Sequence, residues 1–310
     1  MGYRVAAASM KSPSPSHSRN EDRFRYSVDG DYGVMVVADG AGSLPRSAEG
    51  ADIVVDTVTD YCRSRWGDVS TSDDGEKLVD EALNAATEAV KTHDEWRDMG
   101  CTVAVVLVAP GVWACGVVGD AFAVTYNRDG EWGFVSSHRP EGCPPNVTTF
   151  VTSPDQNRVV TSGEGDLDGV AVSSDGLAHA SIKDRQPHEG FWTPVIDKCV
   201  HNTLDLEALF AFMDERGMVM DDTTVVVASR IDVEDSEEDI PGSDDSASGV
   251  VCSGRGPEDT GGSDSRDNTI TGGDIPDDNG DGDTVDHGDT VLNGSGGGAH
   301  AADLADTSNM

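Results

Sequence analysis

Four short acidic motifs in this sequence lie where apolar runs begin or end. The motifs are Asp39-Gly40 after residues 33–38, Gly119-Asp120 after 112–118, Asp175-Gly176 after 169–174, and Asp221-Asp222 before 223–228. A carboxylate placed where a buried strand meets a loop can reach a site and still remain hydrated. Four such carboxylates from distant segments can together bind hard divalent cations such as Mg²⁺ or Mn²⁺, which prefer oxygen ligands.

A cluster of this kind is suited to phosphoryl chemistry. Two divalent ions about 3.5–4 Å apart polarise a phosphoryl oxygen and lower the pKa of the water that attacks phosphorus. No covalent intermediate with the protein is then required. Mg²⁺ keeps several of its own waters, so few protein ligands are needed, but those few must be rigidly placed.

The elements that must place these ligands are a mixture of strands and helices. Apolar runs predict strands at 3–9, 33–38, 101–109, 112–118, 121–126, 131–136, 169–174 and 223–229. Apolar residues at helical spacing predict helices near 46–65, 76–95, 191–201 and 205–216. The turn sequence at 127–130 indicates a hairpin, and strands joined by tight turns pair antiparallel. We therefore expect an α+β fold with two antiparallel β-sheets packed face to face and helices outside.

The formal net charge of the chain is −37, and only five of its 310 residues are lysine. Such a surface argues against binding to the nucleic-acid backbone and to anionic membranes, both of which require clustered Lys and Arg. An Asp-rich, Lys-poor surface is typical of proteins that stay hydrated in concentrated salt. The composition therefore predicts a halophilic protein; an ordinary acidic protein is the alternative.

The composition changes near residue 230. Positions 231–310 hold 21 acidic residues and two basic ones, and large apolar side chains become sparse there. A segment of this kind cannot bury enough apolar surface to offset the loss of chain entropy on folding. The sequence thus predicts one folded domain over 1–230 and an acidic tail over 231–310, disordered from residue 235 onward.

The six cysteines form no Cys-x-x-Cys pair and show no zinc-ligand spacing. The N-terminus lacks a signal-peptide core, and no apolar stretch reaches about 18 residues. We therefore expect a protein of the reducing cytoplasm.

Six motifs occur together in one order along the chain. They are Asn20-Glu21-Asp22, Asp39-Gly40-Ala41-Gly42-Ser43, Gly100-Cys101-Thr102, Gly119-Asp120, Ser174-Asp175-Gly176-Leu177 and Asp221-Asp222-Thr223-Thr224-Val225. This set resembles the PPM-type (type 2C) metal-dependent serine/threonine protein phosphatases over roughly residues 4–230. The run at 146–152 resembles a segment of the divergent prokaryotic branch. The resemblance implies a four-layer αββα sandwich and two, or three, Mg²⁺ or Mn²⁺ ions.

The resemblance also assigns metal ligands residue by residue. Asp39 matches the carboxylate that bridges the two catalytic metals, and the Gly40 carbonyl matches a ligand of the second metal. Asp175 and Asp221 match ligands of the first metal. Asp120 matches the ligand of a third, weaker metal, which it shares with Asp175.

Two further positions match the site, and two depart from it. Glu21 and Asp22 match the acidic pair that holds water near the second ion. His17 stands where many members of the family have an arginine that clamps the substrate phosphate, and a histidine is a poorer clamp. Ala41 stands where many eukaryotic members have a histidine that protonates the leaving group.

The resemblance predicts hydrolysis of phosphoserine and phosphothreonine in proteins, with substrates linked to a Ser/Thr kinase. Two alternatives remain at this point. One, favoured by the two departures, is a non-catalytic phosphoprotein-binding or regulatory module on the same fold. The other is an acidic interaction or ion-buffering protein that acts through its tail.

Overall fold

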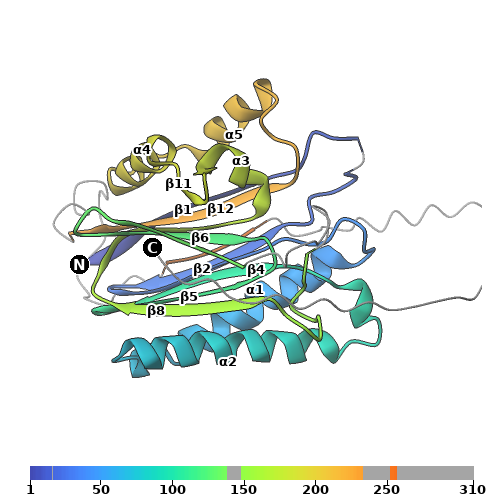
Figure 1. Cartoon of the computed structure of the whole chain (residues 1–310), viewed down its shortest axis with the longest axis horizontal. Helices are drawn as coiled ribbons and strands as arrows, with labels where there is room; N and C mark the ends of the chain where they lie inside the picture. The colour runs from blue at the N-terminus through green and yellow to red at the C-terminus, as the bar shows by residue number, and fades with distance from the viewer. Residues whose placement is uncertain (16, 138–147, 233–251, 257–310) are drawn as a thin grey trace, which may run out of the picture. The chain divides into compact units, whose positions relative to one another are not determined.

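The computed structural model describes residues 1–15, 17–137, 148–232 and 252–256, which form two antiparallel β-sheets packed face to face (Figure 1). The five-stranded sheet has, in spatial order, β1 (Gly2–Met10), β12 (Thr223–Ile231), β9 (Leu167–Ser173), β6 (Phe122–Asn127) and β7 (Trp132–Ser136). The six-stranded sheet has β13 (Cys252–Arg255), β2 (Arg23–Asp29), β3 (Tyr32–Ala38), β4 (Val103–Ala109), β5 (Val112–Val118) and β8 (Arg158–Glu164).

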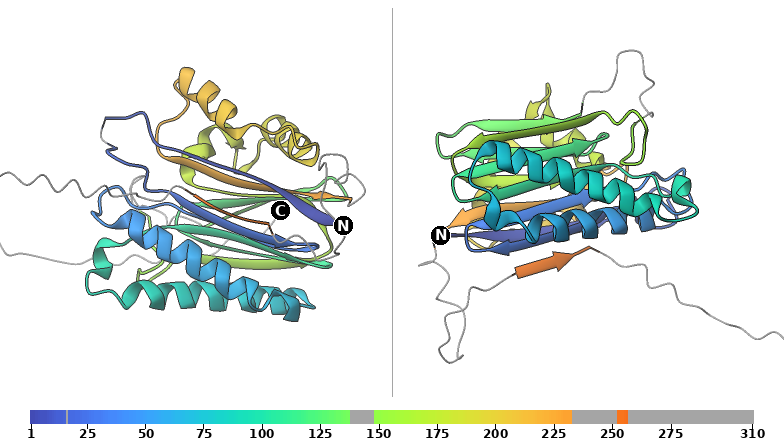
Figure 2. Two further views of the ribbon diagram at one scale, coloured as in Figure 1. Left: turned by 180° about the vertical axis from the view of Figure 1, so that it is seen from behind. Right: turned by 90° about the horizontal axis from the view of Figure 1, so that it is seen from below.

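Helices cover the outer face of each sheet (Figures 1 and 2). The six-stranded sheet is covered by α1 (Ser47–Arg63) and α2 (Ser72–Lys91). The five-stranded sheet is covered by α4 (Glu189–Val200) and α5 (Leu206–Glu215), with the one-turn α3 (Ala178–Ser181) beside them. Short elements complete the chain: η1 (Trp66–Asp68), η2 (Trp96–Asp98), η3 (Asp175–Leu177), β10 (Ile182–Lys183) and β11 (Gln186–Pro187). No helix among the described residues is long and apolar enough to cross a bilayer.

Strand β4 shows why its sequence is continuously apolar instead of alternating. Val103, Val105 and Leu107 belong to the core beneath α1 and α2, whereas Val106 and Val108 belong to the core between the two sheets. A strand buried on both faces needs apolar residues at every position. A third core lies between the five-stranded sheet and α4 and α5. The predicted α+β sandwich of two antiparallel sheets flanked by helices is confirmed.

Several elements differ from the prediction, among them two long strands and the start of one helix. The sequence analysis missed β2 and β8, whose polar residues interrupt the apolar pattern: β8 lies at a sheet edge, and β2 carries two arginines on its helix-facing side. Helix α2 starts at Ser72, earlier than the predicted residue 76. The cause is a capping box, in which the Thr71 and Asp74 side chains each bind the other's backbone amide.

The acidic tail contains one ordered element that the sequence analysis did not predict. Strand β13 pairs antiparallel with β2, from Cys252 opposite Val28 to Arg255 opposite Arg25. The prediction of disorder is therefore wrong for residues 252–255. An edge strand such as β2 offers unpaired backbone groups to which an extended segment can bind. The other residues after 232 lie outside the described part of the chain.

Candidate active site

The four acidic motifs meet at one end of the paired sheets. Asp39 follows β3, Asp120 follows β5, and Asp175 follows β9. Strand β12 is antiparallel to β9, with Val225 opposite Ser173, so the start of β12 lies beside the end of β9. The pairing of strands, not sequence proximity, therefore brings the motif before β12 to the same place.

A cavity of about 470 Å³ opens at this end. It is lined by His17, Glu21, Asp39, Gly40, Ala41, Gly42, Ser43, Thr102, Asp120, Thr148, Phe150, Asp175, Asp221 and Asp222. Every predicted site residue except Asp22 is among them. None of the described lining residues is lysine or arginine, so the carboxylates that face the cavity have no permanent cation in its wall.

Three of the predicted metal ligands form the tightest group. One carboxylate oxygen from each of Asp39, Asp120 and Asp175 lies within 4.8 Å of the other two. Burial raises the pKa of Asp39 well above its usual range, and the charges of Asp22, Asp175 and Asp120 raise it further. Like charges this close repel one another strongly. A divalent cation bound between these oxygens would remove that repulsion, and the donor set therefore fits Mg²⁺ or Mn²⁺.

Asp22 lies behind the cavity wall and is fully buried. One of its oxygens accepts a hydrogen bond from the Ser174 hydroxyl at 2.7 Å, and the other, Oδ1, has no hydrogen-bond partner within the described structure. Burial raises the pKa of Asp22 to about 7; the Ser174 hydrogen bond opposes this rise and the charge of Asp222 adds to it. Asp22 thus offers a buried oxygen at the site without lining its surface.

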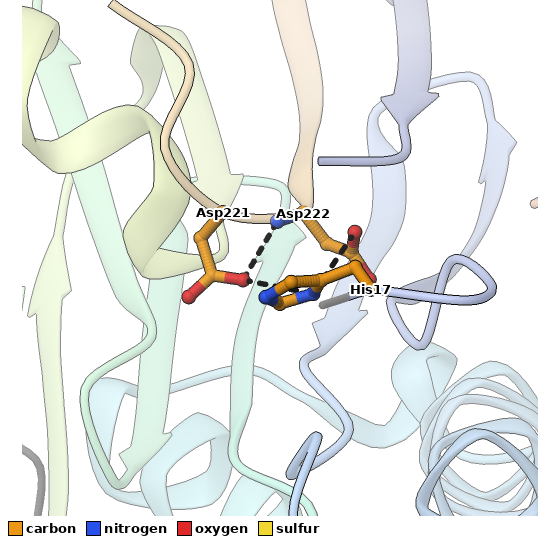
Figure 3. Close-up of side chains that lie close together, drawn as sticks. All are labelled: His17, Asp221 and Asp222. Atoms are coloured by element: carbon orange, nitrogen blue, oxygen red, sulfur yellow. Dashed lines mark hydrogen bonds and ion pairs between the residues drawn. The ribbon is translucent and has the colours of Figure 1, made fainter. Parts of the chain in front are cut away.

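Asp221 belongs to a second group, with His17 and Asp222 (Figure 3). Its Oδ1 atom lies 3.6 Å from His17 Nδ1 and accepts a hydrogen bond from the Asp222 amide at 2.8 Å. The side chain of Asp221 is 53% exposed, whereas that of Asp222 is 5% exposed. The His17 ring therefore lies beside carboxylates at the cavity wall.

The two adjacent aspartates have different roles because their side chains face opposite ways. Asp222 accepts backbone hydrogen bonds of 2.7 Å from Ser12 at Oδ1 and from Glu21 at Oδ2. It thereby ties the loop between β1 and β2, which carries His17 and Glu21, to the start of β12. Asp221 is the more exposed of the two, and both line the cavity; the assignment of Asp221 as the ligand stays a prediction.

The glycines of two Asp-Gly motifs allow the loops of the site to pack against one another. A Cβ atom on Gly40 would lie 2.7 Å from the Glu21 carbonyl oxygen, and one on Gly176 would lie 2.1 Å from the Asp222 carbonyl oxygen. A larger residue at either position would displace the neighbouring loop. Each motif therefore combines a carboxylate with a close backbone contact to another part of the site.

The carboxylate of Glu21 is oriented by three contacts. Its Oε1 atom accepts a hydrogen bond from the Ser47 hydroxyl at 3.1 Å and forms an ion pair with Arg19 at 3.4 Å. The backbone amide of Glu21 adds the third contact by donating a hydrogen bond to Asp222. Arg19 also donates to the Pro45 carbonyl at 2.7 Å. Sequence reasoning did not identify the contributions of Ser47 and Ser174, because no local pattern marks a serine whose partner is more than twenty residues away.

Comparison with known proteins identifies a family and a shared fold. The family model for protein phosphatase 2C matches residues 12–211. The serine/threonine phosphatase PstP/Ppp of Mycobacterium tuberculosis is 20% identical, with a TM-score of 0.53, and the match covers 75% of this chain and 100% of that one. A crystal structure of the PstP catalytic domain with two manganese ions gives a TM-score of 0.55 at 20% identity, and the match covers 74% of this chain and 99% of that one.

More distant members share the same fold. Serine/threonine phosphatase Stp1 of Staphylococcus aureus matches at 16% identity and a TM-score of 0.51, over 73% of this chain and 94% of its own. Serine-threonine phosphatase 2C of Toxoplasma gondii matches at 14% identity and a TM-score of 0.54, and the match covers 74% of this chain and 95% of that one. No curated protein matches the sequence significantly.

These matches confirm the predicted resemblance and the predicted enzyme class, a protein serine/threonine phosphatase. The family match spans the loop between β1 and β2 and three of the four acidic motifs, and ends in α5. This chain belongs to the protein phosphatase 2C family.

Proposed function

We propose that this protein hydrolyses phosphoserine and phosphothreonine in proteins at a centre of two divalent cations, Mg²⁺ or Mn²⁺. Asp39 and the Gly40 carbonyl, together with Asp175 and Asp221, would hold the two ions, and Asp120 would help to hold a third. The observation that carries the proposal is the convergence of the Asp39, Asp120 and Asp175 oxygens within 4.8 Å. A nearby Ser/Thr kinase system is the proposed source of its substrates.

The bound cations would supply the positive charge that lowers the pKa of a water molecule and withdraws electrons from the phosphoryl group. The protein's own residues orient the reactants. In this proposal Glu21 and Asp22 accept hydrogen bonds from water near the second ion, and the buried Asp22 Oδ1, which has no other hydrogen-bond partner in the described structure, is one such acceptor.

The substrate end of the cavity differs from that of relatives with an arginine clamp. His17 lines the cavity and would donate one hydrogen bond to the phosphate, where an arginine would donate two. Ala41 also lines the cavity and has no proton to give. Another group or water must therefore protonate the departing serine or threonine alkoxide.

The alternative of a non-catalytic module predicts a cavity without metal affinity. The carboxylates that converge at the cavity argue against it, because a module that binds only phosphate would be opposed by this negative charge. Calorimetric titration with Mn²⁺ separates the two proposals: absence of binding by the full chain would favour the module.

The first prediction concerns the purified full chain. With Mn²⁺ it should hydrolyse p-nitrophenyl phosphate and a phosphothreonine peptide, and EDTA should abolish both activities because the ions supply most of the electrostatic catalysis. Restoring Mn²⁺ should restore the rate. Turnover that persists at the same rate in EDTA would contradict the proposal.

The second prediction concerns salt. Carboxylates dominate the charge of the chain, so their mutual repulsion in dilute buffer should lower its stability. Screening by salt reduces this repulsion. We expect the midpoint of thermal unfolding to rise between 0.1 and 2 M KCl, measured with and without EDTA to separate metal effects. A midpoint that is equal or higher at low salt would exclude halophilic adaptation.

A further inference from the structure

One face of helix α1 carries an acidic ladder, which we define as Asp52, Asp56 and Asp60. These residues are four apart and therefore lie on the same side of the helix. Arg23 and Arg25 extend toward this ladder from β2: Arg23 Nε lies 3.0 Å from Asp52, and Arg25 lies 3.1 Å from Asp56 and 2.9 Å from Asp60. The two arginines occupy alternate positions of one strand, so both point to the helix.

A third arginine reaches the acidic ladder from the tail. Arg255 of β13 lies 2.9 Å from Asp56 and 3.6 Å from Asp52. It is opposite Arg25 in the strand register and so faces the same side of the sheet. The last 80 positions contain only two basic residues, and this is one of them. Charge complementarity therefore favours the binding of this segment, among the segments of an otherwise acidic tail, to the acidic face of α1.

The backbone of β13 fits closely against its neighbour. A Cβ atom on Gly254 would lie 2.2 Å from the Tyr26 ring, so a side chain at this position would have to displace that ring. The Gly256 amide donates a hydrogen bond of 2.8 Å to the Phe24 carbonyl, which extends the pairing past the strand. Figure 2 shows β13, in orange, along the outer edge of the six-stranded sheet. The family match ends at residue 211, so this strand lies beyond it.

A chain of contacts connects Arg255 with the backbone on either side of Glu21, a residue that lines the catalytic cavity. Asp52 binds Arg255 through one oxygen and Arg23 through the other. Arg23 is only 2% exposed, and its Nη1 atom donates hydrogen bonds of 2.9 Å to the carbonyl oxygens of Asn20 and Asp22. These two carbonyls flank Glu21 in the chain. The route from Arg255 to the acidic pair of the site thus consists of two contacts between Asp52 and arginines and two hydrogen bonds from Arg23 to backbone carbonyls.

We propose that the segment 252–256 is a docking strand that binds the edge of β2 and the acidic ladder of α1, and that its binding orients Glu21 and Asp22 through Asp52 and Arg23. The tail then acts as an activator of the catalytic domain. Arg23, Asp52 and Arg255 are positioning residues in this scheme, because none of them lines the cavity. The proposal rests on the proposed phosphatase function only for its effect on turnover.

Docking is tested by amide hydrogen exchange of the full chain, which requires no activity. In the Arg255→Glu and Gly254→Val variants, the β2 amides that pair with β13 should exchange at least about tenfold faster than in the wild type, because the edge of the sheet is open. Arg266→Glu makes the same change of charge in the same tail and is the matched control. Equal exchange of β2 in Arg255→Glu and Arg266→Glu would overturn the proposed docking.

The coupling to the site is tested by kinetics of the same variants. Arg255→Glu and Gly254→Val should lower kcat about fivefold and raise the Mn²⁺ concentration for half-activation, as expected when an outer contact of a metal site is lost. The KM for p-nitrophenyl phosphate should not change, and Arg255→Lys should recover most of kcat. Faster β2 exchange with unchanged kcat and Mn²⁺ activation would overturn the coupling. Absence of Mn²⁺-dependent turnover in the wild type would contradict the proposed function and leave the exchange result decisive for docking.

Discussion

Asp39→Asn is expected to lower the Mn²⁺-dependent kcat by at least about a thousandfold, equivalent to about 4 kcal/mol of transition-state stabilisation. Burial raises the pKa of Asp39, and the charges of Asp22, Asp175 and Asp120 raise it further; one of its oxygens lies within 4.8 Å of oxygens of Asp120 and Asp175. The amide keeps the size of the side chain but loses the negative charge that binds the cations. Steady-state turnover of p-nitrophenyl phosphate over a range of Mn²⁺ concentrations measures the loss.

Although Asp39→Asn should lose turnover, it should not lose thermal stability when stability is measured without metal. Removing one charge from a cluster of like charges relieves repulsion, so Asp39→Asn in EDTA should unfold at the same temperature as the wild type or a higher one. Mn²⁺ should stabilise the wild type, because a ligand of the native state raises its free energy of unfolding, and should stabilise the variant much less. Asp129→Asn, in the exposed turn between β6 and β7, is the control for charge alone. Wild-type turnover and wild-type Mn²⁺ stabilisation in Asp39→Asn would disprove the role of this residue.

Single replacements of the two adjacent aspartates by alanine should separate the structural role of Asp222 from the proposed metal-binding role of Asp221. Asp222→Ala is expected to lower the free energy of unfolding by about 3 kcal/mol, because the amides of Ser12 and Glu21 both lose their buried acceptor. Asp221→Ala removes an exposed side chain and should change the free energy of unfolding in EDTA by less than about 0.5 kcal/mol. Urea unfolding in EDTA measures both values.

Activity should distinguish this pair as well. Asp221→Ala should raise the Mn²⁺ concentration required for turnover while the protein stays folded. In Asp222→Ala the fraction that remains folded should have lower kcat, because the loop with His17 and Glu21 is no longer tied to β12. A stable, fully active Asp222→Ala protein would show that the anchor is unnecessary. An unstable Asp221→Ala protein with unchanged metal dependence would reverse the two assignments.

The sequence was sufficient to predict the sheets because burial determines composition. Strands such as β4 and β12 are continuous apolar runs, and each acidic motif marks a strand end. Strands β2 and β8 were missed because their polar residues, which have partners elsewhere, interrupt the apolar pattern. Arg23 and Arg25 make β2 appear too charged for an interior strand, and only the acidic ladder of α1 explains their presence.

The sequence by itself determined the metal-ligand candidates and the phosphatase family, since these depend on residue types in a fixed order along the chain. Only the tertiary structure decided how the candidates are divided: Asp39, Asp120 and Asp175 in one group, Asp221 beside His17, and Asp22 buried behind them. It also decided that residues 252–255 of the acidic tail form a strand. The physical reason is the same in each case. Chain order and composition are local properties, whereas the partner of a buried charge or of an open sheet edge depends on which distant segments the fold brings together.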